Sequence, residues 1–320
     1  MLADRIGERA AIATGIGLCG LGFTAAAFAP GFASLCVLLA LAGAAGSSVN
    51  SASGRAVMAW FPAEQRGFAL GIRQAAIPIG GALAALALPS IEQAGGLEAA
   101  FLAIACVSFT GAIVAALVIR DRPREPAIAS EVPRTLHDRA LWLLCASGGC
   151  YVVAQIAVIS FVVLYLHDER GWSDSEAAAV LAAIQVLAVA SRIAVGAWSD
   201  RVRSRVGPLR LVGVAAAVSI GLVALVTDAP IGVVVAAFLA AGVIGMSWNG
   251  LSFTAAAEIG GYARSGAAIG MQQTALSVAG LAAPVVFAAL VSASGWQLAY
   301  GVAALFPLAG WALLGPLAGR

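Results

Sequence analysis

Long apolar runs separated by short polar breaks dominate the chain. A helix needs about 20 apolar residues to cross a bilayer. Runs of that length lie at 11–29, 33–58, 68–90, 98–119, 140–166, 174–197, 209–227, 231–257, 266–291 and 297–318. The breaks between them carry proline, glycine or charged residues, which are typical of helix ends. The pattern therefore predicts an all-α polytopic membrane protein with ten spanning helices.

The composition agrees with lipid as the surrounding solvent, because 61% of the residues are hydrophobic and only 11% are charged. The net charge of +2 gives no reason to expect a nucleic-acid partner. The sequence holds no nucleophile–base constellation, no metal-ligand spacing and no phosphate-binding loop. We therefore expect a protein that is not an enzyme and that uses no cofactor or metal.

The breaks between the apolar runs alternate in arginine content. One side of the membrane receives Arg5, Arg9, Arg66, Arg120, Arg122, Arg124, Arg134, Arg139, Arg201, Arg203, Arg205, Arg210, Arg264 and Arg320. The other side receives Arg170 alone, among acidic residues such as Glu92 and Asp228. Because arginine-rich loops stay in the cytoplasm, both termini are expected there. The predicted location is a bacterial-type inner (cytoplasmic) membrane, crossed many times.

The chain also contains an internal repeat, because residues 46–101 are echoed at 245–300 with a constant offset of 199. Asn50 and Gln74, for example, recur as Asn249 and Gln273. Transporters with a solute site at the bilayer midplane are built from such parallel repeats. The second copy begins near Ala140, so the first would begin about 60 residues before Met1 (140 minus 199). We therefore expect the start of the first half to be missing.

Two segments resemble the cytoplasmic loop signature of the major facilitator superfamily, G-x-L-A-D-R-x-G-R-R. They read LADRIGER at 2–9 and GAWSDRVRSRVG at 196–207. In that family the first loop joins helices 2 and 3, so the resemblance implies that the ten runs are helices 3 to 12 of a two-half bundle. It implies an incomplete first half at 1–119, a cytoplasmic linker at 120–139 and a second half with helices 7 to 12 at 140–320.

The resemblance further implies a cytoplasmic gate. A helix N-terminus carries unpaired N–H groups and a partial positive charge, which favour a nearby carboxylate. Asp200 is then expected to cap the start of the 68–90 helix, and Asp4 to face the start of the 266–291 helix. The gate candidates are Asp4, Arg5, Arg9, Arg66, Arg192, Asp200, Arg201, Arg205 and Arg264. The alternative interpretation is that these are solvated charges that only set the topology.

Polar residues inside the spans are candidates for the solute cavity, because such residues are costly at membrane depth. Arg73 is followed by Gln74, and the second copy has a pair of glutamines at the same place. Arg73 is expected either to contact the solute or to have a structural or gating role. The candidate set is Asn50, Arg55, Arg73, Gln74, Gln155, Gln185, Trp248, Asn249, Gln272 and Gln273.

These features favour a secondary transporter that moves a small-molecule substrate by alternating access, surrounded by membrane lipid. The resemblance implies a monomer. Arg55 and Arg73 favour an organic or inorganic anion as substrate. No acidic residue lies deep in a span, so the coupling partner is left open between a proton and a counter-substrate.

Two alternatives stay open. The segment IPIGG at 77–81 partly resembles the helix 5 motif of drug/proton antiporters, which would mean efflux of hydrophobic compounds by proton antiport. The other alternative is a non-transporting membrane fragment from a truncated gene.

Overall fold

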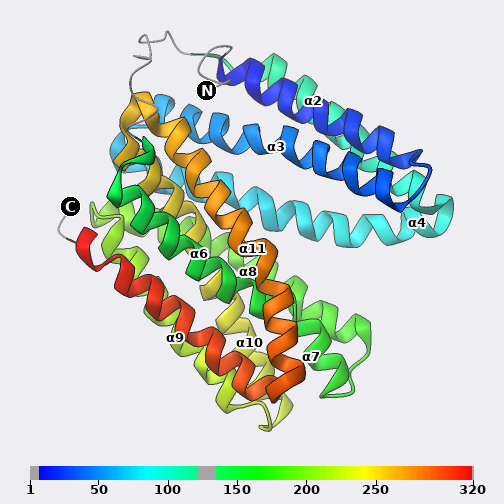
Figure 1. Ribbon diagram of the computed structural model, residues 1–320, viewed down its shortest axis with the longest axis vertical. Helices are drawn as coiled ribbons and strands as arrows, with labels where there is room; N and C mark the ends of the chain where they lie inside the picture. The colour runs from blue at the N-terminus through cyan, green and yellow to red at the C-terminus, as the bar shows by residue number, and fades with distance from the viewer. Residues whose placement is uncertain (1–6, 122–134, 319–320) are drawn as a thin grey trace. The chain divides into compact units, whose positions relative to one another are not determined.

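The computed structural model describes residues 7–121 and 135–318, and every regular element in them is a helix (Figure 1). The helices are α2 (Glu8–Ala27), α3 (Phe32–Trp60), η1 (Ala63–Gln65), α4 (Arg66–Val118), α6 (Arg139–Ile159), α7 (Val162–Asp168), α8 (Asp174–Arg201), α9 (Val206–Leu225), α10 (Ile231–Gly245), α11 (Trp248–Leu313) and η3 (Gly315–Leu317). The predicted all-α class is confirmed for this part of the chain.

Three glycines with positive φ interrupt the two longest helices. Gly96 divides α4 with φ 72° and ψ −176°. Gly261 and Gly295 lie within α11 with φ of 69° and 79°. Glycine adopts such angles at little cost because it has no Cβ. Gly96 and Gly295 are equivalent positions of the 199-residue repeat, so both copies bend at the same register.

Eight helical stretches of the described chain are long and apolar enough to cross a membrane. Two of them, Ala63–Val118 and Arg264–Leu317, have 56 and 54 residues. A single crossing needs about 20 residues. Each stretch is therefore long enough to cross twice, once before and once after its glycine, Gly96 or Gly295. The count of ten spans stays a prediction.

Two of the predicted apolar runs contain a break. The run at 140–166 is divided into α6 and α7, and the run at 231–257 into α10 and α11. At the second break the Ser247 hydroxyl donates to the Ile244 carbonyl at 2.8 Å, and Arg192 donates to the Met246 carbonyl at 2.8 Å. Side chains thus satisfy carbonyls at the end of α10, an arrangement that hydropathy does not reveal.

The chain forms two compact units, which are described separately. The first contains residues up to Trp60 together with Leu83–Thr135 and Gly260–Gly270. The second contains Phe61–Ala82, Leu136–Ile259 and Met271–Arg320. The predicted division into 1–119, 120–139 and 140–320 follows the repeat and stays a prediction.

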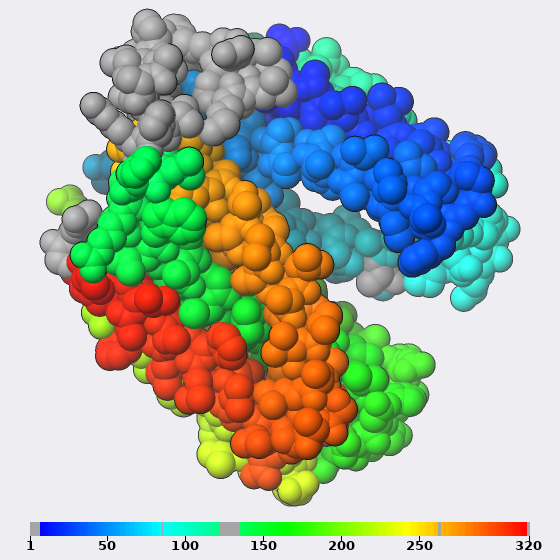
Figure 2. All heavy atoms as spheres, in the orientation of Figure 1, coloured from blue at the N-terminus to red at the C-terminus, as the bar shows by residue number. Residues whose placement is uncertain are grey.

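In the first unit, α2 and α3 lie side by side (Figures 1 and 2). Small residues permit this contact, because a Cβ on Gly22 would lie 2.6 Å from the Cβ of Ala42. A small core of buried residues forms here, consisting of Ala11, Ile12, Ala52 and Ala115. Close approach through small residues is typical of helices that pack in a membrane.

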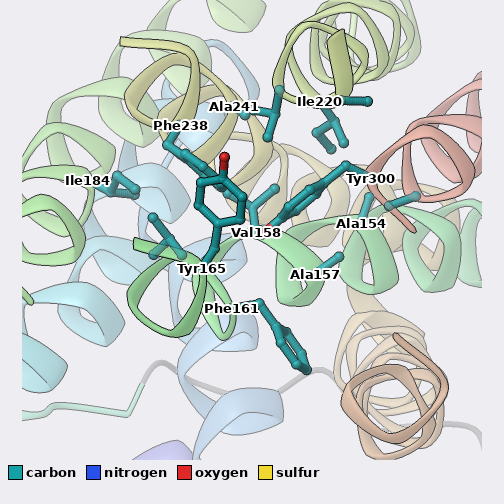
Figure 3. Close-up of a cluster of buried hydrophobic side chains, with 14 of the residues drawn as sticks. Ala154, Ala157, Val158, Phe161, Tyr165, Ile184, Ile220, Phe238, Ala241 and Tyr300 are labelled. Atoms are coloured by element: carbon teal, nitrogen blue, oxygen red, sulfur yellow. The ribbon is translucent and has the colours of Figure 1, made fainter. Parts of the chain in front are cut away.

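The second unit has a larger core, with an aromatic cluster at its centre (Figure 3). The ring of Phe238 lies 5.1 Å from that of Tyr165 and 5.5 Å from that of Tyr300. The Tyr165 hydroxyl donates to the Thr227 carbonyl at 2.7 Å, which satisfies a polar group that burial would otherwise leave unpaired.

The repeat reappears as a pair of equivalent helix contacts. In the second unit, a Cβ on Gly250 would lie 3.1 Å from the Cα of Gly71. In the first unit, a Cβ on Gly270 would lie 3.2 Å from Ser51 Oγ. Adding 199 converts residues 51 and 71 into 250 and 270, so one contact is the repeat image of the other.

Large apolar side chains are exposed on the surface of both units. Phe32, Leu86 and Leu281 are 82%, 78% and 80% exposed. Exposed apolar patches of a soluble protein are small, whereas lipid favours this kind of surface.

Candidate functional site

Asp200 caps the first turn of α4. The backbone N–H of Gly67 donates to Asp200 Oδ1 at 3.0 Å, and that of Phe68 donates to Oδ2 at 2.8 Å. Both donors belong to the unpaired N–H groups of a helix start, where the helix dipole also favours a negative charge. Gly67 and Asp200 are 133 positions apart in the sequence. Their contact is the one that the resemblance to the signature loop implied.

Arg205 holds the Asp200 carboxylate in place. Its guanidinium lies 2.5 Å from Asp200 Oδ1 and 2.7 Å from Ser199 Oγ, and it donates to the Ala63 carbonyl at 2.6 Å. It also forms an ion pair with Glu258 at 3.0 Å. Burial alone would lower the pKa of Arg205, but hydrogen bonding and attraction to Glu258, and then to Asp200, raise it, so the group stays charged. Glu258 is thus a member of this cluster that the sequence alone did not assign to it.

Close glycine contacts bring α4 and α8 together beside this cluster. A Cβ on Gly67 would lie 2.5 Å from the Gly196 carbonyl oxygen, and a Cβ on Gly71 would lie 2.8 Å from the Arg192 carbonyl oxygen. Gly67 and Gly71 form a G-x-x-x-G pair, which puts both on one face of the helix. The backbone of α4 therefore lies directly on that of α8.

A cavity of about 640 Å³ opens beside the cluster in the second unit. Glu64, Arg66, Arg203 and Glu258 are among its lining residues. Arg66 donates from Nε to the Phe61 carbonyl at 3.2 Å. Because charges of both signs line the cavity, it has the character of a solvated vestibule. Arg201, another predicted gate residue, is exposed.

The remaining gate candidates belong to the first unit. The backbone N–H of Arg9 donates to Asp121 Oδ1 at 2.9 Å. Arg264 is partly exposed. Asp4 and Arg5 lie outside the described residues, so the expected contact of Asp4 stays a prediction.

Arg192 precedes Asp200 by eight residues, about two turns, on the same helix α8, and is only 2% exposed. Its Nη1 donates to the Gln74 carbonyl at 2.5 Å and its Nε to the Met246 carbonyl at 2.8 Å. Among the described residues no carboxylate forms an ion pair with it. Arg192 therefore contacts the backbone of Gln74, a solute-site candidate, and of Met246, and not the acidic cluster.

Gln74 connects Arg192 with Arg73. The Arg73 Nη1 donates to Gln74 Oε1 at 3.2 Å, while the Gln74 backbone carbonyl accepts from Arg192. Gln74 is 2% exposed, and Arg73 is partly buried. Two guanidinium groups thus contact one residue within a stretch of α4 predicted to lie in the membrane.

A second polar group links α6 and the start of α11. Gln155 Oε1 accepts from Trp248 Nε1 at 3.1 Å and from Asn249 Nδ2 at 2.9 Å. Because an indole nitrogen can only donate, the atom of Gln155 that faces it is the oxygen. The orientation of the Gln155 amide is therefore fixed, with its NH₂ group directed away from Trp248.

The other glutamine candidates also lie in the second unit. Gln272 is fully buried and donates to Ser252 Oγ at 2.9 Å, and its Oε1 has no hydrogen-bond partner in the described chain. Gln273 donates to Ser277 Oγ at 3.3 Å. Gln185 Oε1 is buried without a partner among the described residues. Buried amide oxygens of this kind are available to a donor from a solute or from water.

In the first unit, Arg55 pairs with Glu8. Arg55 Nε lies 2.9 Å from Glu8 Oε1, and the two side chains are 7% and 8% exposed. Asn50 lies on α3 and is partly exposed. The ion pair compensates the charge of Arg55, and sequence spacing gave no sign of the carboxylate that does so.

These observations describe a helical protein with apolar stretches long enough to span a membrane, and the comparisons identify its family. A sequence model of the Major Facilitator Superfamily matches residues 1–261. The chain belongs to this superfamily, and is therefore a membrane-spanning transporter and not an enzyme.

Two relatives and one solved structure illustrate the match. An uncharacterised MFS-type transporter of Mycobacterium tuberculosis is 36% identical over 312 residues, which cover 96% of this chain and 70% of the relative. A probable sulfoacetate transporter of Cupriavidus necator is 28% identical over 324 residues, covering 92% of this chain and 74% of the relative. The crystal structure of the Escherichia coli fucose:proton symporter has a TM-score of 0.77 at 18% identity, covering 98% of this chain and 84% of that one. The similarity to the symporter concerns the fold alone.

Proposed function

We propose that the protein is a secondary active transporter that moves a small organic or inorganic anion across the cytoplasmic membrane by alternating access. The observation that carries this proposal is the placement of Arg73 and Arg192 on Gln74, with no carboxylate paired to Arg192 among the described residues. We further propose ten spanning helices in two halves, cytoplasmic termini and a monomeric carrier.

The charge of this stretch favours an anionic solute. A guanidinium at membrane depth is costly unless a partner compensates it. Carbonyl oxygens compensate Arg192 only in part, because they carry partial charges, so the combined positive potential of Arg192 and Arg73 favours an anion bound beside Arg73. A cationic solute would meet repulsion at the same place. Arg55 no longer contributes to this argument, because Glu8 pairs with it.

Asp200, Arg205 and Glu258 supply the gate of the proposed cycle. Asp200 binds the start of α4 from the end of α8, and Arg205 ties that carboxylate to Glu258. When α4 moves away from α8, the two capping hydrogen bonds and the close glycine contact must break together. The cluster would therefore stabilise the state that is closed on the cytoplasmic side.

The relative from Cupriavidus necator supplies the first solute to test, because it is named as a probable sulfoacetate transporter. Purified protein in liposomes loaded with unlabelled sulfoacetate should take up labelled sulfoacetate by counterflow. Acetate, phosphate and neutral fucose serve as competitors. Competition by anions, without competition by fucose, is the expected result.

Arg73→Gln removes the charge and should lower uptake about tenfold, as the loss of one charged hydrogen bond would. Arg73→Lys keeps the charge and should retain part of the uptake. Arg139→Gln, at an exposed position, is the matched control. Unchanged uptake by Arg73→Gln would contradict the assigned role. Extrusion of ethidium without anion flux would favour drug antiport, and the absence of any flux would favour a non-transporting protein.

A further inference from the structure

The starting point is a carbonyl group that α4 cannot satisfy by itself. In an α-helix the carbonyl of residue i−4 accepts from the N–H of residue i. Pro78 follows Gln74 by four positions and has no N–H. The Gln74 carbonyl therefore lacks its helical donor, although Gln74 is only 2% exposed.

Arg192 supplies the missing donor. Its Nη1 donates to the Gln74 carbonyl at 2.5 Å, so this carbonyl has a side-chain donor although residue 78 offers no N–H. Its Nε donates at the same time to the carbonyl of Met246, the C-cap residue of α10. A single guanidinium thus satisfies two carbonyls that the helices leave unpaired, one at a proline and one at a helix end.

Both carbonyls adjoin the solute-site candidates. Gln74 carries the side-chain oxygen that binds Arg73. Met246 stands two residues before Trp248, whose indole fixes the amide of Gln155. Arg192 therefore connects the Arg73–Gln74 turn of α4 with the start of α11.

We infer that Arg192 is a positioning residue for the solute site, which acts by replacing the N–H that Pro78 lacks. This inference rests on the proposed function for its effect on transport. The geometry requires an arginine, because a guanidinium offers several donors in a rigid fork, whereas an ammonium is a point charge on a flexible stem. The guanidinium then binds backbone carbonyls of α4 and α10. It affects the solute indirectly, by holding Gln74 and Met246 in position.

The test is a double-mutant experiment on Arg192 and Pro78. Arg192→Lys keeps the charge but has one nitrogen in place of the two that reach the carbonyls, so we expect one contact to be lost and the KM for sulfoacetate counterflow to rise about tenfold, the effect of one charged hydrogen bond. Pro78→Ala alone should change KM little, since it restores a helical N–H for Gln74. Arg192→Lys combined with Pro78→Ala should recover most of the loss. Pro284→Ala, which restores an N–H in α11, is the matched control and should rescue nothing.

A second readout separates this inference from the proposed function. The thermal unfolding midpoint in detergent should fall with Arg192→Met, and fall less when Pro78→Ala is also present. If the changes in midpoint caused by Arg192→Met and by Pro78→Ala simply add in the double variant, the inference is overturned. Full transport activity of Arg192→Lys, together with no effect of Pro78→Ala, would also overturn the inference. That result would instead mean that the Arg192 charge pairs directly with the solute. If the wild type transports none of the tested anions, the proposed function fails, while the midpoints still decide the inference.

Discussion

Gly67 and Gly196 face each other where α4 crosses α8, and the space between them has no room for a methyl group. A Cβ on Gly67 would lie 2.5 Å from the Gly196 carbonyl oxygen. The obstructing atom belongs to the backbone, so no side chain can rotate away to make room. This contact brings the start of α4 within reach of the Asp200 carboxylate.

Gly67→Ala should therefore lower the thermal unfolding midpoint, because overpacking at a backbone contact costs about 1–3 kcal/mol. Gly232→Ala, at a position in α10 with open space around it, is the control and should leave the midpoint unchanged or raise it. Equal midpoints for Gly67→Ala and the wild type would mean that the two helices are not held this closely.

Asp200→Asn should weaken closure on the cytoplasmic side. The amide keeps one oxygen acceptor but loses the charge that pairs with Arg205 and that complements the start of α4. A charged hydrogen bond contributes about 1.5–3 kcal/mol, so the population open to the cytoplasm should rise about tenfold. Labelling of a cysteine introduced at Ala69, which is only 7% exposed near the start of α4, measures this population when it is read from the cytoplasmic side. Asp228→Asn, at an exposed position, should not change it.

Glu8→Gln should destabilise the first unit by about 1–3 kcal/mol, because it removes the buried carboxylate that lies 2.9 Å from Arg55 Nε. Replacing both residues by methionine should restore much of the loss, since an apolar pair needs no charge compensation. Thermal midpoints of the two single variants and the double variant decide this point. If the double variant is less stable than either single one, the ion pair makes a larger net contribution than we argue.

Gln155→Glu should impair anion transport while leaving stability nearly unchanged. A carboxylate can still accept from Trp248 and Asn249, but it has lost the NH₂ donor and adds a negative charge. We expect a KM for sulfoacetate raised about tenfold or more. Gln297→Glu introduces the same charge at an exposed position and is the matched control. An unchanged KM would remove Gln155 from the solute site.

Gly295→Ala should lower the thermal midpoint more than Gly295→Asn does. The backbone φ of 79° costs about 1 kcal/mol for a residue with a Cβ, and asparagine tolerates the left-handed region better than alanine. The same order is expected at Gly96, with φ 72°. A reversed order at either position would mean that the bend tolerates a right-handed backbone.

Much of the helical fold could be predicted from the sequence, because the length of an apolar run is a local property of the chain. The place of Asp200 at the start of α4 could also be expected, since the resemblance to the signature loop of the superfamily implies it. The partners Glu258 and Glu8 could not, because ion pairs between distant helices depend on which helix faces meet. The donors for the Gln74 and Met246 carbonyls could not be expected either, since a proline indicates that a donor is missing but not which residue replaces it.

The bends at Gly96 and Gly295 have a consequence for how the chain is made. On each side of these glycines the helix continues with no intervening loop. Because no polar loop separates the two apolar segments, the second segment cannot stay in water while the first one inserts into the bilayer. Each pair would therefore leave the insertion machinery together, as a preformed helical hairpin. An epitope placed directly after either glycine would then reduce the amount of protein that reaches the membrane.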